Sequence, residues 1–241
     1  MKFNIIIPNY NCSRFLEKCI LSCVNQSHSD YKIIFIDNES SDDSLEIAKK
    51  IQKQYPEKII IDSAPNIYPY CWDECITKAF DYMDGDFFTI IAADDWIEKD
   101  YLRNFENWLL EQNREILIAQ SSLIWIQNNE QINYVNHEYN SLNDLKKQLI
   151  QSCCVNTPTV FFSTKLVEKK LYTPQPHLYS GAADYALYCH LVDNDIYIEN
   201  IGKWIGYNYH IHEKQATWSM NKNPISYSNI IQKKWKDKWK I

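Results

Sequence analysis

Glycine is scarce in this sequence, with 4 residues among 241. A glycine-rich loop that wraps phosphate groups is therefore excluded, and any phosphate has to be held by a metal ion, by side chains or by helix ends. The formal net charge is −6, which argues against a general nucleic-acid-binding protein.

Two further patterns are absent. The eight cysteines contain no Cys-x-x-Cys pair, so zinc-ribbon spacing is excluded and we expect reduced, buried thiols in a cytoplasmic protein. No apolar run reaches the roughly 18 residues of a membrane-spanning helix, and residues 1–11 turn polar too early for a signal peptide. With 45% hydrophobic and 23% charged residues, the composition is that of a globular domain.

Apolar runs and helical patterns alternate through the first 95 residues. Apolar runs predict buried strands at 3–7, 31–36, 58–61 and 86–91, and amphipathic patterns predict helices at 15–24, 45–51 and 71–82. This alternation implies a doubly wound, mostly parallel sheet. The less regular second half predicts helices at 101–110, 141–150 and 181–192, and strands at 116–126, 159–162, 196–198 and 204–210.

Polar residues stand where three of the predicted strands end. The first strand runs into residues 8–11, the second ends at Asp37, and Asp94 and Asp95 follow the fourth. The carboxyl ends of parallel strands open on one edge, where α/β sheets bind ligands. Adjacent carboxylates repel each other unless a cation lies beside them, and Mg²⁺ or Mn²⁺ is the simplest such cation. The alternative is that the pair only caps a helix over 96–110.

Three segments together resemble the family 2 glycosyltransferases. They are residues 5–11 (IIIPNYN), 36–44 (IDNESSDDS) and 93–95 (ADD), in the order and at the spacing of that family. The resemblance implies the GT-A fold, a Rossmann-like, doubly wound, mostly parallel α/β sheet with an irregular acceptor-side C-terminal half. It covers about the first 110 residues closely.

The resemblance also implies a division of the chain. Residues 1–110 are expected to bind the nucleotide-sugar, and residues 111–222 to bind the acceptor and carry catalysis within the same domain. A basic tail, 223–241, follows. The implied reaction is an inverting, metal-dependent transfer of a hexose-type sugar from a nucleoside diphosphate, with UDP favoured, to a hydroxyl group of a glycan or lipid-linked acceptor in surface-polysaccharide synthesis.

Roles for the strand-end residues follow from the same resemblance. Pro8 and Tyr10 would border the nucleobase together with Asn9, and Asp37 would accept a hydrogen bond from the N–H edge of the base. Asp94 would hold the ribose hydroxyls.

The resemblance also points to Asn66 and Asp73 as nucleotide-binding residues. It points to Asp95 and His212 as metal-binding residues. Asn66 and Asp73 can reach the nucleotide, although the glycine usual after such an asparagine is missing here. Asp95 would bind Mn²⁺ or Mg²⁺ on the diphosphate. Residues 209–217 (YHIHEKQAT) resemble a Tyr-Arg-x-His signature in which the histidine, here His212, approaches the metal or the diphosphate.

A hydroxyl acceptor must lose a proton, and a placed carboxylate can take it. The segment 180–185 (SGAADY) resembles the acidic helix start that supplies this base, so Asp184 is the expected base, with Ala183 in place of the usual glutamate. Asp184 can also be a plain helix-entry acid. Asp193 and Asp195 are the alternative bases.

Residues 233–240 form a basic segment with two tryptophans. Trp235 and Trp239 are four residues apart and share one helix face. Such a segment can lie on the anionic inner surface of a membrane, or the two tryptophans can pack on the body of the protein.

Two other functions compete with glycosyl transfer. A nucleotidyltransferase that forms nucleotide-sugars would want a glycine-rich, basic loop after the first strand, and residues 8–11 supply neither property. A non-catalytic nucleotide- or glycan-binding domain is the other alternative, and the retention of all four expected acidic site residues argues against it.

Overall fold

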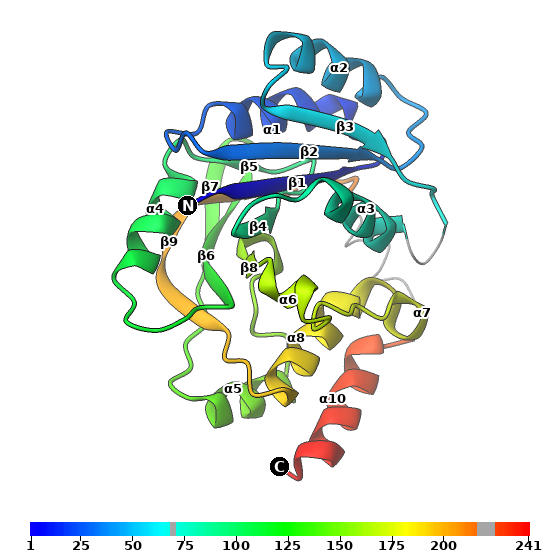
Figure 1. Cartoon of the computed structure of the whole chain (residues 1–241). Helices are drawn as coiled ribbons and strands as arrows, with labels where there is room; N and C mark the ends of the chain where they lie inside the picture. Colours follow the sequence, from blue (N-terminus) through cyan, green and yellow to red (C-terminus); the bar gives the residue numbers. More distant parts are fainter. Residues whose placement is uncertain (68–70, 216–224) are drawn as a thin grey trace.

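The computed structural model describes residues 1–67, 71–215 and 225–241. Nine strands of this part of the chain form one sheet in the order β3-β2-β1-β4-β8-β6-β9-β5, with β7 beside β6. The sheet is mixed, and the parallel pairings of its first four strands are those of the doubly wound sheet that the sequence predicts. Figure 1 shows the strands of the first half at the top and the helices of the second half below them.

The first half alternates strands and helices as predicted. The strands are β1 (Phe3–Asn9), β2 (Tyr31–Asp37), β3 (Ile59–Ser63) and β4 (Phe87–Ile90), and their pairings β3-β2, β2-β1 and β1-β4 are all parallel. The helices are α1 (Ser13–Val24), α2 (Ser44–Gln54) and α3 (Cys71–Ala79), followed by the 3₁₀ turn η1 (Phe80–Tyr82). The parallel register places the carboxyl ends of β1 and β2 side by side, with Asn9 opposite Asp37.

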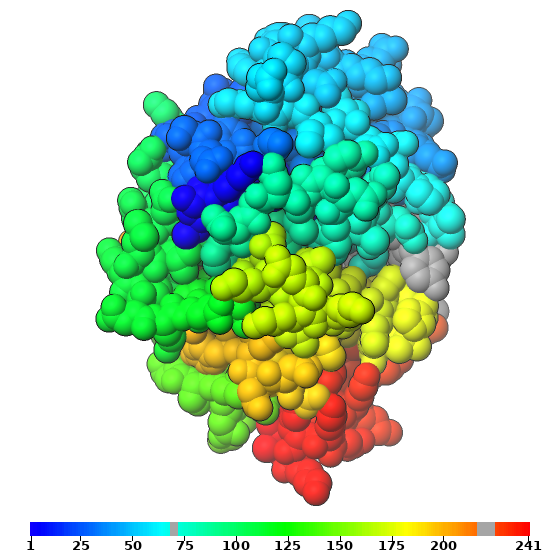
Figure 2. Space-filling model, viewed as in Figure 1, coloured from blue at the N-terminus to red at the C-terminus, as the bar shows by residue number. Residues whose placement is uncertain are grey.

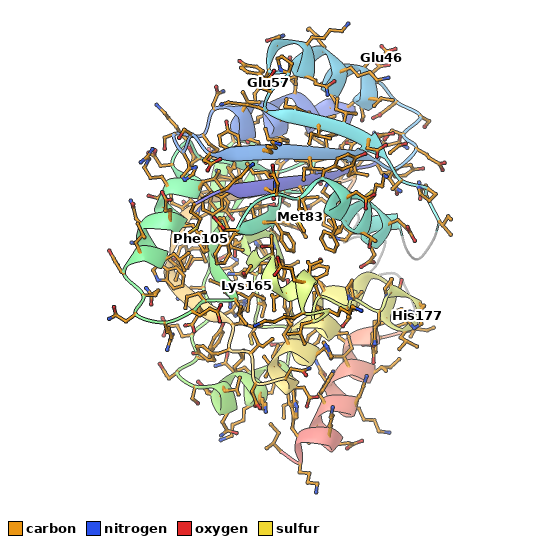
Figure 3. The ribbon with its side chains drawn as sticks, viewed as in Figure 1. Glu46, Glu57, Met83, Phe105, Lys165 and His177 are labelled. Carbon is orange, nitrogen blue, oxygen red and sulfur yellow. The ribbon has the colours of Figure 1, made fainter. Side chains whose placement is uncertain are left out.

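Apolar residues alternate between two cores because successive side chains of a strand point to opposite faces. Phe3, Ile5 and Ile7 of β1 join the core under α1, α2 and α4 (Tyr101–Leu110). Ile6 joins the other core, which includes residues of α3 and of five helices of the second half. All seven residues of β1 are buried, as expected of a strand covered on both faces. Figure 3 shows side chains filling both layers, with Phe105 of α4 at the left.

The second half adds antiparallel pairings and short helices. Its strands are β5 (Trp96–Ile97), β6 (Ile118–Gln127), β7 (Glu130–Val135), β8 (Phe161–Ser163) and β9 (Glu199–His210). Its α-helices after α4 are α5 (Leu142–Leu149), α6 (Lys165–Glu168), α7 (Pro176–Tyr179), α8 (Ala183–Asp193) and α10 (Tyr227–Trp239), and its 3₁₀ turns are η2 (Thr157–Thr159) and η3 (Ser180–Ala182).

Four sequence predictions differ from this arrangement. Residues 96–97 are a strand paired with β9, so Asp94 and Asp95 do not cap a helix, which begins only at Tyr101. The strands predicted at 196–198 and 204–210 are replaced by one, β9. Strand β7 was not predicted, because only three of its six residues are apolar, Ile132, Tyr134 and Val135. The helix predicted from residue 181 begins at Ala183, after a 3₁₀ turn.

The C-terminal helix packs on the body through its tryptophans. Trp235 is 4% exposed and belongs to a core cluster, and the Trp239 indole N–H donates to Asp193 Oδ1 at 3.0 Å. The two aromatic rings therefore point inward, as in the second of the two expectations for this segment. The predicted boundary between residues 222 and 223 lies outside the described residues. No helix in the described ranges is both long and apolar enough to span a membrane.

Candidate active site

The ends of β1 and β2 are joined by a buried hydrogen-bond network. The Asn9 side-chain amide donates to Asp37 Oδ1 at 2.9 Å and to Ser40 Oγ at 3.0 Å, and the Ser40 backbone N–H donates to Asp37 Oδ2 at 2.9 Å. Asn9 and Asp37 are only 2% and 3% exposed. The Asn9 Oδ1 atom is buried and has no hydrogen-bond partner among the described residues. The network fixes the loop that enters α2 and leaves one polar atom unsatisfied at the strand ends.

Other residues predicted for the nucleotide side surround this network. Pro8 is buried within β1, whereas Tyr10 is 52% exposed directly after the strand. The backbone N–H of Asn66 donates to Glu39 Oε2 at 3.1 Å, which ties the segment after β3 to the loop after β2. The structure therefore gathers residues of three chain segments at one edge, with an exposed aromatic ring beside them.

Asp95 is a buried anchor for β9. It is 2% exposed, its Oδ2 accepts from the Tyr207 hydroxyl at 2.6 Å, and its Oδ1 accepts from the His210 backbone N–H at 2.7 Å. Burial, and then the charge of Asp94, raise the pKa of Asp95 well above its ordinary value. Both carboxylate oxygens are thus engaged by the protein.

Asp94 faces a histidine. Its Oδ2 lies 2.9 Å from His212 Nε2, and its side chain is 20% exposed against 7% for His212. The Phe15 ring packs against both His212 and His210, with centroids 4.4 and 5.0 Å away, and so helps to fix both imidazoles. The two side chains share a hydrogen bond, and they offer one carboxylate oxygen and one imidazole nitrogen that could bind a metal ion.

The donor set for a metal is small. In the described part of the chain, no group of three or more His, Cys, Asp or Glu side chains is arranged to hold an ion. Asp94 and His212 would need further oxygen ligands from a substrate, which is how Mg²⁺ and Mn²⁺ are commonly bound beside phosphates. The residues therefore fit a substrate-completed metal site.

Asp184 lies in the first turn of α8 with both oxygens positioned. Its Oδ2 accepts from the Thr157 hydroxyl at 2.7 Å, and its Oδ1 accepts from the Tyr185 backbone N–H at 2.7 Å. Burial raises the pKa of Asp184. Thr157, which the sequence analysis missed, comes from η2, 27 residues earlier. No local pattern marks it, because its role depends on a contact between distant segments.

Asp73 lies within electrostatic reach of Asp184. Burial, and then the negative charge of Asp184, raise the pKa of Asp73 to about 6 from an ordinary value of 3.8. The sequence suggested a nucleotide contact for Asp73. The structure leaves that contact a prediction and adds an electrostatic interaction with Asp184, the expected base.

The shifted pKa of Asp73 predicts a pH dependence of stability. Between about pH 4 and pH 6 the folded chain keeps a proton on Asp73 that the unfolded chain has lost. The free energy of unfolding is therefore expected to fall as pH rises through this window, by up to about 3 kcal/mol from this group. We expect Asp73→Asn to remove this part of the change in the free energy of unfolding with pH. Urea unfolding at pH 4, 5, 6 and 7 measures it.

The control for this experiment is Asp81→Asn. Asp81 lies on the surface of η1, where it pairs with Lys78 at 3.0 Å. In this variant the free energy of unfolding should change with pH as it does in the unchanged protein. If Asp73→Asn leaves the pH dependence of the free energy of unfolding unchanged, Asp73 has the same pKa in the folded and unfolded chains.

Comparison with known proteins gives one family match. The model of the family described as Glycosyl transferase family 2 matches residues 4–172. A poly(ribitol-phosphate) beta-glucosyltransferase from Bacillus spizizenii is 29% identical over 122 residues, which are 50% of this chain and 19% of that protein. The match to this relative thus spans about a fifth of its length.

Two solved structures have a similar fold. One is Staphylococcus aureus TarS 1-349 in complex with UDP-GlcNAc, with a TM-score of 0.70, 18% identity, and coverage of 94% of this chain and 62% of the other. The second is the mannosyltransferase PcManGT from Pyrobaculum calidifontis in complex with GDP-Man and Mn²⁺, with a TM-score of 0.64, 12% identity, and coverage of 96% and 68%. At these identities the likeness shows the fold alone.

Proposed function

This chain belongs to glycosyl transferase family 2, and we propose that it transfers a sugar from a nucleoside-diphosphate-sugar to a hydroxyl acceptor. The observation that carries the proposal is the Asp94–His212 pair, which lies at the carboxyl edge of the sheet that also holds the Asn9–Asp37 pair. UDP-sugars are the favoured donors, and the acceptor is a glycan or a lipid-linked precursor of a surface polysaccharide. Two similarities support this choice: one relative is a poly(ribitol-phosphate) beta-glucosyltransferase, and TarS has been solved in complex with UDP-GlcNAc.

We assign the metal to Asp94 and His212, in place of Asp95. Asp95 is 2% exposed and both of its oxygens already accept hydrogen bonds from β9, whereas Asp94 is more exposed and faces the imidazole. A bound Mn²⁺ or Mg²⁺ would neutralise the charge that develops on the leaving nucleoside diphosphate. Asp95 then acts indirectly, because it fixes the end of β9, two residues before His212. This assignment replaces the sequence-based role of Asp94 at the ribose.

The nucleotide base is proposed to lie against Tyr10. The exposed ring offers a stacking face, and the buried Asn9–Asp37 pair beneath it offers polar atoms for the edge of a base. Pro8 and Asn66 complete the border of this site. Residues 1–110 thus bind the donor, and residues 111–222 bind the acceptor and supply the base.

Proton transfer is assigned to Asp184. In a single displacement the acceptor oxygen attacks the anomeric carbon, its proton passes to the Asp184 carboxylate, and the bond to the diphosphate oxygen breaks with inversion. The Thr157 hydroxyl holds one carboxylate oxygen at 2.7 Å and so limits rotation of the base. Burial raises the proton affinity of Asp184, which suits a general base.

A thermal-shift panel tests the donor class. We expect UDP with Mn²⁺ to raise the unfolding temperature more than GDP, dTDP or CDP, and EDTA to remove the effect. A ligand at about 100 times its dissociation constant adds about 2.7 kcal/mol, which corresponds to roughly 5–10 °C for a chain of this size. A shift by nucleoside triphosphates alone would favour a nucleotidyltransferase. No shift with any nucleotide would favour a non-catalytic domain and contradict the proposal.

A further inference from the structure

A cavity of about 150 Å³ lies where α7, α8 and α10 meet. In Figure 1 these helices come together at the lower right, and His177 of α7, labelled in Figure 3, marks the neighbourhood. In the space-filling view of Figure 2, the red residues of α10 lie directly against the yellow residues of the preceding helices. The cavity can hold several water molecules or one phosphate group with a small substituent. None of the proposed donor, metal or base residues lines it.

The lining of the cavity carries positive charge. Lys234 and Lys238 of α10 both line it. Lys238 forms an ion pair with Asp193, so its charge is compensated. Lys234 donates to the neutral Tyr179 hydroxyl at 2.8 Å, and no carboxylate in the described ranges forms an ion pair with it. One ammonium charge at the cavity is therefore left without an anion.

A buried donor at the cavity also lacks a partner. Trp235 lines the cavity and is 4% exposed, and its indole N–H is buried without a hydrogen-bond partner in the described part of the chain. The Lys234 ammonium lies 5.2 Å from the centroid of this ring. This cation–π contact partly stabilises the charge of the Lys234 ammonium, but it gives the indole N–H no hydrogen-bond acceptor. An unpaired buried donor costs stability, and an acceptor oxygen of a ligand would satisfy it.

The remaining polar lining adds neutral hydrogen-bonding groups. Thr173, Gln175 and His190 contribute a hydroxyl, an amide and an imidazole. Burial lowers the pKa of His190, and both nearby lysines lower it further against the opposing charge of Asp193. The imidazole is therefore neutral at neutral pH and leaves the net charge to Lys234.

We propose that this cavity binds a phosphate group of a small phosphomonoester or of a lipid headgroup. The ammonium of Lys234 supplies the charge and the Trp235 N–H a directed hydrogen bond, in the way that a lysine recognises phosphate as a point charge. The site is independent of the proposed sugar transfer, since it needs none of the residues assigned to that reaction. It would also tie α10 to α7 and α8, because its ligand contacts all three.

Binding is tested with two soluble probes, inorganic phosphate and glycerol 3-phosphate, by isothermal titration calorimetry. We expect saturable binding of at least one probe, weakened about tenfold or more by Lys234→Gln and by Trp235→Phe. Lys233→Gln is the matched control, because Lys233 is an exposed neighbour on α10 that does not line the cavity. Trp235→Phe removes the N–H and keeps an aromatic ring, and thermal unfolding checks that the variant folds. Should it not fold, Lys234→Gln decides alone.

Vesicle sedimentation separates the two sources of phosphate. Vesicles of phosphatidic acid in phosphatidylcholine are compared with pure phosphatidylcholine. Binding to the anionic vesicles alone, lost in Lys234→Gln but kept in Lys233→Gln, identifies a lipid headgroup. Binding of a soluble probe without vesicle binding identifies a soluble phosphomonoester. The proposal is overturned if neither the soluble probes nor the vesicles bind. It is also overturned if Lys234→Gln binds them as tightly as Lys233→Gln does, whether both variants keep binding or both lose it.

Discussion

Asp184→Asn is expected to lower sugar transfer by about 10³-fold and to leave donor binding unchanged. A positioned general base contributes roughly 10²- to 10⁴-fold to such reactions, and an amide cannot accept the proton. The asparagine oxygen can accept from the Tyr185 backbone N–H, and its amide N–H can donate to Thr157 Oγ1, so the geometry of the first turn of α8 should be kept. The measurements are the transfer rate with a UDP-sugar and the thermal shift with UDP and Mn²⁺.

The matched control for this loss is Asp195→Asn. Asp195 follows the C-terminal end of the same helix, is 84% exposed and pairs loosely with Lys146 at 3.9 Å. Its φ of 58° is that of a turn residue. Transfer by this variant should equal that of the unchanged protein. Transfer retained in Asp184→Asn would show that another group takes the proton, and a loss confined to Asp195→Asn would move the base there.

The first half of the fold was predictable because its signals are local. Each buried strand is an apolar run, such as Phe3–Ile7, and each helix between the strands repeats apolar residues at helical spacing. The second half offered weaker signals. The hairpin between β6 and β7 turns at Asn128 and Asn129, whose φ angles are 51° and 64°. Asparagine tolerates such angles, but in the strand that follows only Ile132 and Tyr134 alternate with polar residues, a pattern too short to predict a strand.

The sequence was enough to predict which chain segments meet at the site. It was not enough to predict which side chains contact one another there. The placement of Asp37 beside Asn9 follows from parallel pairing of two strands that the sequence identifies. The roles of Asp94 and Asp95 depend on Tyr207, which lies 112 residues after Asp95, and no local pattern says which carboxylate turns inward. The electrostatic interaction between Asp73 and Asp184 likewise arises only in the folded chain, since the two residues are distant in the sequence.

Alanine substitutions at Asp94 and Asp95 are expected to separate metal binding from stability. Asp94→Ala should abolish the thermal shift with UDP and Mn²⁺ and lower transfer by 10²-fold or more, because it removes the carboxylate that faces His212. Its free energy of unfolding without ligand should fall less than that of Asp95→Ala, because Asp94 is 20% exposed against 2% for Asp95. Asp95→Ala should instead lower the free energy of unfolding by about 3 kcal/mol, because the Tyr207 hydroxyl and the His210 N–H lose their acceptor in a buried place.

Tyr207→Phe distinguishes the structural role of Asp95 from a direct role at the metal. This variant removes one hydrogen bond to Asp95 and keeps the carboxylate, so it should lower stability by about 1–2 kcal/mol and leave the metal-dependent shift in place. Thermal unfolding with and without UDP and Mn²⁺ measures both effects in one experiment. If Asp95→Ala stays stable and loses the shift, while Asp94→Ala keeps it, Asp95 is the metal ligand and its contacts to β9 must open when the donor binds.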